Sequence, residues 1–229
     1  MRNNFLLDAD ETILDFVRSS RESLRAAMRE AGLPYAEEDF SVYKDINDGV
    51  WREYERGALT KPRLVVERFA RFFSAKGIEA DPAAVNALYF SRLCRTGYLF
   101  DGAEAFLHAL QERGKVFLIT NGTPAAQYGR LRAVGLLNAF DGIFVSDEIG
   151  FAKPDARFFS FVLGSTNLAP EECIVIGDSL SSDIAGANAS GILSVWYAPR
   201  GGEPRGARPD AVARSYAEVL SAVDSLRGL

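Results

Sequence analysis

Two carboxylates near the start of the chain are the residues around which a chemical function can be built. Asp8 and Asp10 directly follow the apolar run Phe5–Leu7, and Thr12 lies just beyond them. Two carboxylates crowded at one point repel each other unless a cation or a proton neutralises one of them. We interpret the pair as the nucleophile and the proton-transfer partner of a Mg²⁺-dependent phosphoryl-transfer site.

Polar residues also follow the later apolar runs that predict strands. In a parallel sheet the carboxyl ends of the strands share one edge, so residues far apart in the sequence converge there. Phosphoryl transfer needs a carboxylate nucleophile, hard oxygen ligands for Mg²⁺, donors for the phosphate oxygens and a cation for the developing charge. The residues that supply this set are Asp8, Asp10, Thr120, Asn121, Lys153, Asp178 and Asp183.

The elements that must position these residues alternate from residue 97 onwards. Short apolar runs separated by helical patterns are typical of βα units with right-handed crossovers. Together with the opening strand at 5–7, they predict an α/β fold, a Rossmann-like doubly wound parallel sheet. The further strands are expected at 116–119, 143–145, 173–176 and 193–196, with an edge strand at 211–213.

The segment between the first strand and residue 97 shows helical periodicity and no strand-like alternation. We interpret residues 15–96 as an inserted helical cap domain, and residues 1–14 with 97–229 as the catalytic core. A cap above the strand ends would exclude water and select the substrate. Its helices are predicted at 16–31, 37–56, 60–73 and 81–93.

Three residues of the predicted cap share one helical face. Asn47, Trp51 and Tyr54 are spaced four and three apart. One interpretation is that the aromatic rings pack the cap helices together. The other is that they present an aromatic and amide surface to a planar organic group such as a nucleobase. The sequence leaves both interpretations open.

Composition excludes several classes of function. A formal net charge of −5 argues against binding to a nucleic-acid backbone, which normally needs a basic face. The two cysteines, Cys94 and Cys173, lack zinc-site spacing, and the single His108 falls in a helical pattern, where we expect a surface or satisfied residue. Acid and base chemistry therefore falls to carboxylates or lysine.

The apolar runs bear on the location of the protein. They are all much shorter than the roughly 18 residues of a membrane span. The N-terminus also lacks the layout of a signal peptide. We therefore expect a cytoplasmic protein with no membrane partner, acting as a monomer or homodimer on a small-molecule phosphomonoester.

The ordered set of motifs resembles the phosphatases of the haloacid-dehalogenase superfamily. Asp8 to Thr12 matches the first motif, Thr120 the second, Lys153 the third, and Gly177-Asp178 through Asp183 the fourth. The helical insertion resembles the C1-type cap of that superfamily. The motifs and the insertion together span nearly the whole chain, so the resemblance implies both the fold and the activity.

Beyond these motifs the chain resembles the pyrimidine 5′-nucleotidase branch often called YjjG-type. The implied substrate is a nucleoside 5′-monophosphate. One departure is Ala198, where many members of the branch are expected to carry Asn. The matching stretches are residues 8–12, the cap segment from Asn47 to Thr60, and residues 119–122, 150–154 and 182–184.

The resemblance also implies a role for each residue of the core set. Asp8 attacks phosphorus, and Asp10 protonates the leaving alkoxide and then activates water, for which it must hold a proton near neutral pH. The ligands of Mg²⁺ would be Asp8, the backbone carbonyl of Asp10, and Asp178. Phosphate oxygens would be held by Thr120, the backbone N–H of Asn121 and Lys153, while Asp183 would orient Lys153 or a metal-bound water.

Other functions on the same fold remain as alternatives. A sugar phosphatase or phosphomutase would use the same core motifs. A phosphonatase would need a cap lysine that forms a Schiff base, for which Lys44 and Lys61 are available. A dehalogenase would not need the acid at Asp10. A catalytically silent binding protein would be expected to lack a motif residue, and none is missing.

Overall fold

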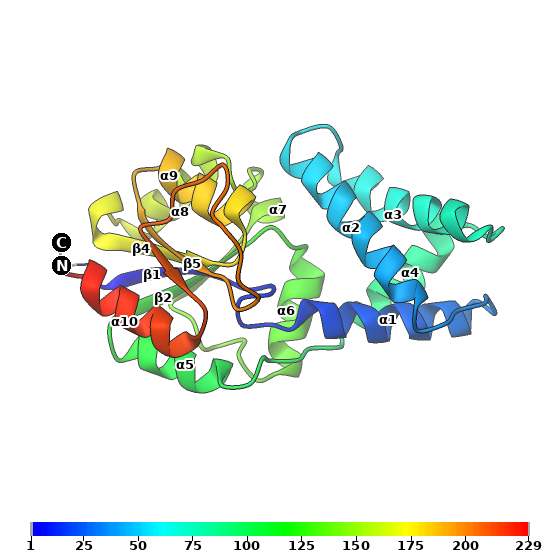
Figure 1. Cartoon of the computed structure of the whole chain (residues 1–229), viewed down its shortest axis with the longest axis horizontal. Coiled ribbons are helices and arrows are strands. Elements are labelled where there is room, and N and C mark those ends of the chain that lie inside the picture. Colours follow the sequence, from blue (N-terminus) through cyan, green and yellow to red (C-terminus); the bar gives the residue numbers. More distant parts are fainter. Residues whose placement is uncertain (1, 229) are drawn as a thin grey trace.

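A six-stranded parallel sheet forms the centre of one half of the molecule in the computed structural model, which describes residues 2–228 (Figure 1). The strand order is β3-β2-β1-β4-β5-β6, with every neighbouring pair parallel, and the predicted doubly wound α/β fold is confirmed. The strands are β1 (Asn4–Asp8), β2 (Lys115–Thr120), β3 (Gly142–Val145), β4 (Cys173–Gly177), β5 (Leu193–Tyr197) and β6 (Ala211–Ala213).

The first strand lies in the middle of the sheet, and its side chains point alternately to the two faces. Leu7 pairs in register with Leu118 of β2 and with Ile176 of β4. Phe5 and Leu7 enter the apolar cluster on one face, whereas Leu6 enters the cluster on the other. Since both faces are covered, β1 reads as a continuous apolar run in the sequence.

Helices from successive crossovers cover the two faces (Figure 1). Residues of α5 (Ala103–Gln111) and α10 (Tyr216–Leu226) pack on the face that carries Phe5 and Leu7. Residues of α8 (Ala156–Thr166) and α9 (Ala185–Ala189) pack on the opposite face. The remaining helices of this half are α6 (Pro124–Ala133), the short α7 (Ser146–Ile149), the 3₁₀ turn η1 (Pro170–Glu172) and the π-helical turn η2 (Leu180–Ile184).

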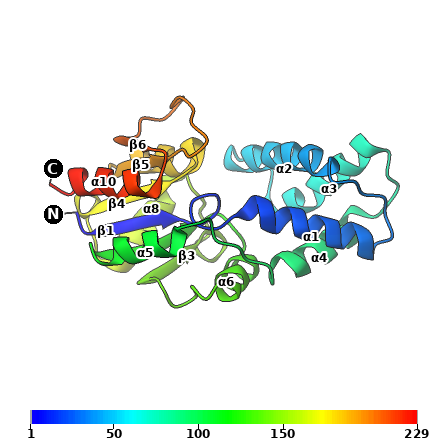
Figure 2. The ribbon, with the colours of Figure 1, turned by 60° about the horizontal axis from the view of Figure 1, so that its bottom comes forward.

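A separate bundle of four helices lies beyond the end toward which β1 points (Figure 2). Its own apolar cluster is rich in aromatic rings, with Tyr43, Phe69, Phe72 and Tyr89 packed against one another. All four helices fall within the segment that we predicted to be helical. They are α1 (Phe16–Glu30), α2 (Asp39–Glu55), α3 (Lys61–Lys76) and α4 (Pro82–Leu93).

The two chain segments that join the bundle to the sheet run side by side. The N–H of Asp15 donates to the carbonyl of Tyr98 over 2.9 Å, and the N–H of Phe100 donates to the carbonyl of Ile13 over 3.1 Å. Leu14 and Leu99 form an antiparallel bridge between these bonds. The chain therefore enters and leaves the helical bundle at adjacent points.

Several predicted element ends were wrong by a few residues. Helix α3 continues to Lys76 and ends at Gly77, whose φ of 64° is the left-handed conformation that glycine adopts without strain. The same helix was predicted from residue 60, but Thr60 is extended and α3 begins at Lys61. Helix α5 begins after Gly102, which is also left-handed, with a φ of 81°.

The single histidine and the two cysteines lie in the surroundings that the sequence predicts. His108 is an exposed residue of α5. Both cysteines are free thiols, Cys173 buried and Cys94 partly so. Within residues 2–228 we find no helix of sufficient length and apolar character to cross a membrane.

Candidate active site

Asp8 is the last residue of β1, and both of its carboxylate oxygens are engaged. Oδ1 accepts from Lys153 Nζ at 2.6 Å, and Oδ2 accepts from Thr12 Oγ1 at 3.2 Å. The side chain of Asp8 is only 9% exposed, and that of Lys153 only 2%. The predicted nucleophile and the predicted cation therefore form a buried pair, with Thr12 fixing the second oxygen.

Lys153 uses its ammonium group to join three elements. Besides Asp8, Nζ donates to Asp183 Oδ1 at 2.7 Å and to the carbonyl of Ile119 at 3.0 Å. Burial alone would lower the pKa of Lys153, but the charges of Asp183 and Asp8 and their hydrogen bonds raise it above its ordinary value. Lys153 therefore remains an ammonium ion throughout the neutral range.

The structure places Lys153 differently from the sequence analysis. We expected it in a loop directly after the third strand, but the helix α7 intervenes between β3 and that loop. The side chain of Asn121 positions this loop. Its Nδ2 donates to the Lys153 carbonyl at 2.8 Å, and its Oδ1 accepts from the Lys153 N–H at 2.9 Å. The loop after β2 thus holds the lysine backbone in place.

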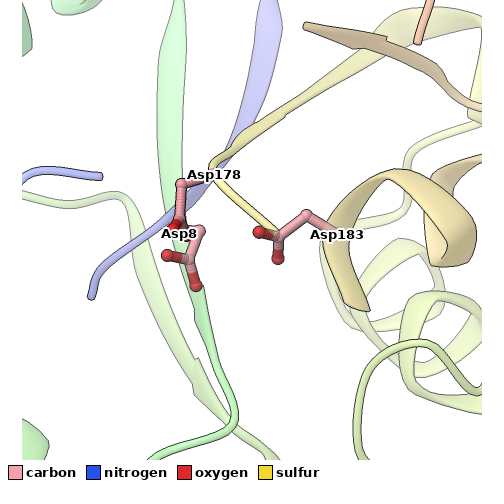
Figure 3. Close-up of side chains that lie close together, drawn as sticks. All are labelled: Asp8, Asp178 and Asp183. Carbon is pink, nitrogen blue, oxygen red and sulfur yellow. The ribbon is translucent and has the colours of Figure 1, made fainter. Parts of the chain in front are cut away.

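Three carboxylates converge at the ends of β1 and β4, as Figure 3 shows. Oxygen atoms of Asp8, Asp178 and Asp183 lie within 4.8 Å of one another. Burial raises the pKa of Asp8 to about 7, opposed by the Lys153 charge and reinforced by that of Asp183. Burial and the nearby charge of Asp8 raise the pKa of Asp178 well above its usual range. One lysine thus compensates for three acids.

The cluster fits a divalent cation. Its donors are carboxylate oxygens, the ligands that Mg²⁺ prefers. In the described part of the chain Asp178 forms no side-chain hydrogen bond or ion pair, while Trp196 Nε1 donates to its backbone carbonyl at 2.8 Å and fixes its loop. Asp183 is already occupied by Lys153 and by the N–H of Ser179 at 3.0 Å. Asp8 and Asp178 are therefore the carboxylates best placed to bind a metal.

The raised pKa of Asp8 predicts a pH-dependent response to Mg²⁺. Because the pKa of Asp8 in the folded protein is about 7 and its ordinary value is 3.8, the contribution of Asp8 to stability is present below about pH 4 and lost as the pH rises toward 7. Mg²⁺ would bind the ionised cluster, so we expect it to stabilise the protein by about 3 kcal/mol at pH 7 when it is in hundredfold excess over Kd, and by less at pH 5.

Urea denaturation with EDTA and with Mg²⁺ at the two pH values measures this difference. Asp178→Asn is the matched variant, and it should remove most of the Mg²⁺ effect. An equal effect of Mg²⁺ at pH 5 and pH 7 would contradict the prediction.

Thr120 is the last residue of β2, the strand next to β1, and Asn121 follows it directly. Thr120 Oγ1 accepts from the N–H of Gly122 at 3.0 Å and from Gln127 Nε2 at 2.8 Å. Since the Asn121 side chain is committed to the Lys153 backbone, its contribution to an incoming anion would come from its main chain. The structure brings both predicted phosphate-binding residues to the cavity that Asp8 and Lys153 line.

Asp10, which we expected to hold a proton near neutral pH in a lidded site, lies among charged and polar partners. Its side chain is 30% exposed and forms an ion pair with Arg130. Gln127 Nε2 also donates to Asp10 Oδ2 at 2.7 Å. Both neighbours are buried residues of α6 that the sequence analysis missed. Their spacing of three on one face of the helix after the Thr120 loop is the signal that could have identified them.

The three residues singled out in the predicted cap divide into two groups. Asn47 and Trp51 line a cavity of about 210 Å³ together with Asp8 and Asp10, and they also line the neighbouring cavity of about 350 Å³. Tyr54 lies outside both cavities and packs edge-on against Trp51, with ring centroids 5.7 Å apart. The structure therefore brings Asn47 and Trp51 to the site, whereas Tyr54 supports Trp51 from behind.

Two residues of the helical bundle, Lys61 and Glu55, also contact loops near the site. Lys61 Nζ donates to the carbonyl oxygens of Asn121 and Gly122, at 2.6 and 3.1 Å, and pairs with Asp147 at 2.7 Å. Ser181 donates to Glu55 at 2.9 Å. Lys44 pairs with Asp48. Both lysines that a phosphonatase could use are thus paired with carboxylates of the protein, Lys44 with Asp48 and Lys61 with Asp147.

The fold and this carboxylate site define a haloacid dehalogenase-like hydrolase. The sequence model of the haloacid dehalogenase-like hydrolase family matches residues 3–191, and the chain belongs to this family. The chain is 34% identical over 226 residues to the pyrimidine 5′-nucleotidase PynA of Streptococcus pneumoniae, covering 96% of this chain and 94% of PynA. It is 30% identical to the pyrimidine 5′-nucleotidase YjjG of Escherichia coli, covering 93% of each chain. The predicted resemblance is therefore confirmed.

Solved structures agree with this assignment. The magnesium-bound structure of the HAD-hydrolase YfnB from Bacillus subtilis matches with a TM-score of 0.91 and 32% identity, covering 97% of this chain and 99% of YfnB. L-2-haloacid dehalogenase from Xanthobacter autotrophicus matches with a TM-score of 0.78 and 18% identity, covering 98% of this chain and 99% of that enzyme. The second match shows a shared fold only.

Proposed function

We propose that this protein is a Mg²⁺-dependent phosphomonoester hydrolase that acts on nucleoside 5′-monophosphates, with pyrimidine nucleotides as its preferred substrates. The observation that carries the proposal is the buried contact of Lys153 with Asp8 and Asp183, beside Thr120 and the unpaired Asp178 carboxylate. This arrangement offers a nucleophile, a cation for a phosphate dianion and oxygen ligands for a metal at one point.

In the proposed reaction the Asp8 carboxylate attacks phosphorus in line, and the bond to the leaving oxygen breaks as an aspartyl phosphate forms. Asp10 gives a proton to the departing alkoxide and then takes one from the water that hydrolyses the intermediate. Thr120 and the N–H of Asn121 bind the non-bridging oxygens. Lys153 balances the charge that develops on them.

The residues that would hold Mg²⁺ are Asp8, the backbone carbonyl of Asp10, and Asp178. The bound ion would supply the positive charge that lets an anionic nucleophile approach a phosphate dianion. Asp183 orients Lys153, in keeping with its 2.7 Å contact. We also propose that residues 15–96 act as the substrate-selecting cap domain of a cytoplasmic enzyme.

The choice of a nucleotide is supported from two directions. Relatives that match nearly the whole chain at 30–34% identity are named as pyrimidine 5′-nucleotidases. In addition, Trp51 and Asn47 offer a ring and an amide in the cavity that reaches Asp8. A planar base with hydrogen-bonding edges suits such a surface better than a sugar phosphate does.

A substrate panel tests the proposed function. Pyrimidine and purine nucleoside monophosphates, sugar phosphates and p-nitrophenyl phosphate are compared with Mg²⁺ and with EDTA. We expect the highest kcat/KM for a pyrimidine nucleotide, and no turnover in EDTA. A preference for sugar phosphates would move the assignment to the alternative enzyme class, and a lack of turnover on the whole panel would indicate a binding protein.

Trp51→Ala tests the role of the cap ring. Stacking of a base on an aromatic ring is worth about 1–3 kcal/mol, so we expect KM for the nucleotide to rise about 10- to 100-fold. The KM for p-nitrophenyl phosphate, which carries no base, should change much less. Phe161→Ala, at an aromatic residue that is 47% exposed on α8, is the control. Equal losses on both substrates would assign Trp51 to cap packing.

A further inference from the structure

We propose that Gln127 and Arg130 are positioning residues that hold the Asp10 carboxylate against Thr120, in the orientation needed to serve a poor leaving group. This inference rests on the proposed function, since it concerns how Asp10 meets the leaving oxygen. Both residues come from one face of α6, the helix that follows the Thr120 loop. They lie outside the motifs that the sequence analysis singled out.

The two residues hold Asp10 at two points. Gln127 Nε2 donates to Asp10 Oδ2 at 2.7 Å, while Arg130 Nη1 pairs with Oδ1. The same Gln127 nitrogen donates to Thr120 Oγ1 at 2.8 Å, which joins Asp10 to the phosphate-binding loop. Because each carboxylate oxygen has its own donor, rotation about the Asp10 side-chain bonds is restricted.

Packing alone does not explain Arg130. Its side chain is 1% exposed, and its Nε and Nη2 atoms are buried without a hydrogen-bond partner. Burying unpaired guanidinium nitrogens is unfavourable, and an apolar side chain of similar length would fill the volume without that penalty. Among residues 2–228, Arg130 forms an ion pair with Asp10 alone, and its guanidinium group also lies over the ring of Phe16.

Glycines set the position of α6 and the reach of Gln127. A Cβ on Gly122 would lie 2.3 Å from Gln127 Nε2, so only glycine leaves room for the amide between Asp10 and Thr120. A Cβ on Gly129 would lie 1.9 Å from the Cys94 carbonyl oxygen, and one on Gly97 would lie 2.5 Å from that of Arg130. Helix α6 therefore packs in direct backbone contact with residues 94–97, the segment that follows α4.

The test uses substrates that differ in their need for an acid. An alkoxide leaving from a nucleotide needs a proton, whereas p-nitrophenolate leaves without one. Positioned acid catalysis contributes about 10²- to 10⁴-fold. We therefore expect Arg130→Met and Gln127→Met to lower kcat for a nucleoside monophosphate about 100-fold. The loss for p-nitrophenyl phosphate should be less than about 5-fold, and KM should stay within about 3-fold for both substrates.

Three companion variants sharpen the result. Arg130→Lys keeps a cation in reach of Asp10 and should recover part of the loss. Gly122→Ala displaces Gln127 and should reproduce the leaving-group dependence without removing a polar group. Arg132→Met, at an exposed arginine on the same helix, is the matched control and should leave both rates unchanged. Thermal denaturation confirms that each variant is folded.

Equal losses on the two substrates, or no loss on either, would overturn the positioning role while leaving the phosphatase proposal intact. If the unaltered protein turned over neither substrate, the proposed function would fail instead. In that case a crystal structure of the Arg130→Met variant would still test whether Arg130 positions Asp10. We expect the Asp10 carboxylate to leave its present orientation, and an unchanged Asp10 would refute the positioning role whatever the activity.

Discussion

Replacement of Lys153 by methionine is expected to lower the free energy of unfolding of the metal-free protein by about 3–5 kcal/mol at neutral pH. The substitution keeps an unbranched side chain of nearly the same length and removes the ammonium group together with its hydrogen bonds. Asp8 and Asp183, which both contact Nζ, would then lie buried beside Asp178 without a compensating cation. Urea denaturation in EDTA measures the loss.

The cause of that loss can be separated from simple loss of packing. The double variant Lys153→Met with Asp183→Asn should recover part of the stability, because it removes one of the uncompensated charges. Mg²⁺ should also recover part of it. Lys115→Met, at an exposed lysine on β2, should change stability by less than about 0.5 kcal/mol. A loss below about 1 kcal/mol for Lys153→Met would show that the carboxylates do not depend on this lysine.

Asp8→Asn is expected to reduce kcat by on the order of 10⁴-fold or more, since covalent catalysis cannot proceed without its nucleophile. The fold should tolerate the change, because burial already makes the Asp8 charge unfavourable and raises its pKa to about 7. Steady-state assays with Mg²⁺ and a nucleotide measure the rate. Mass spectrometry of acid-quenched protein should find phosphate on the peptide containing Asp8 only in the unaltered enzyme.

The control for this variant is Asp101→Asn, which neutralises an exposed carboxylate of the same half of the molecule. It should retain full activity. Turnover by Asp8→Asn within about 10-fold of the unaltered rate would rule out the proposed nucleophile. A large loss of activity combined with early unfolding would instead require the measurement to be repeated at a lower temperature.

The sheet was predictable because its central strands, such as β1 and β4, are buried on both faces. Phe5, Leu6 and Leu7 pack against helices on opposite sides, so each position is apolar, and polar residues at the strand end stand out. The helical segment was recognisable for a related reason. Its apolar residues recur at helical spacing and meet in one aromatic cluster. In both cases the pattern of apolar residues along a short stretch of sequence indicates which side chains are buried.

The parts that were missed depend on contacts between distant residues. Lys61 reaches the loop at Asn121 only because the helical bundle is placed against the sheet. Arg130 is a buried polar residue of α6. The helical periodicity of the sequence cannot indicate that its partner is Asp10, which lies 120 residues earlier in the chain. The short helix α7 covers only four residues, too few for a periodic pattern to be distinguished from a loop.

The paired segments between the sheet and the helical bundle bear on how this protein could evolve. Since Asp15 bonds to Tyr98 and Phe100 bonds to Ile13, the chain leaves the sheet and returns to it at one point. An inserted unit with adjacent ends can be lengthened, exchanged or lost without altering the order of the strands. Under the proposed function, substrate preference could therefore diverge through changes in the helical bundle alone, while the proposed chemistry at Asp8 stays the same.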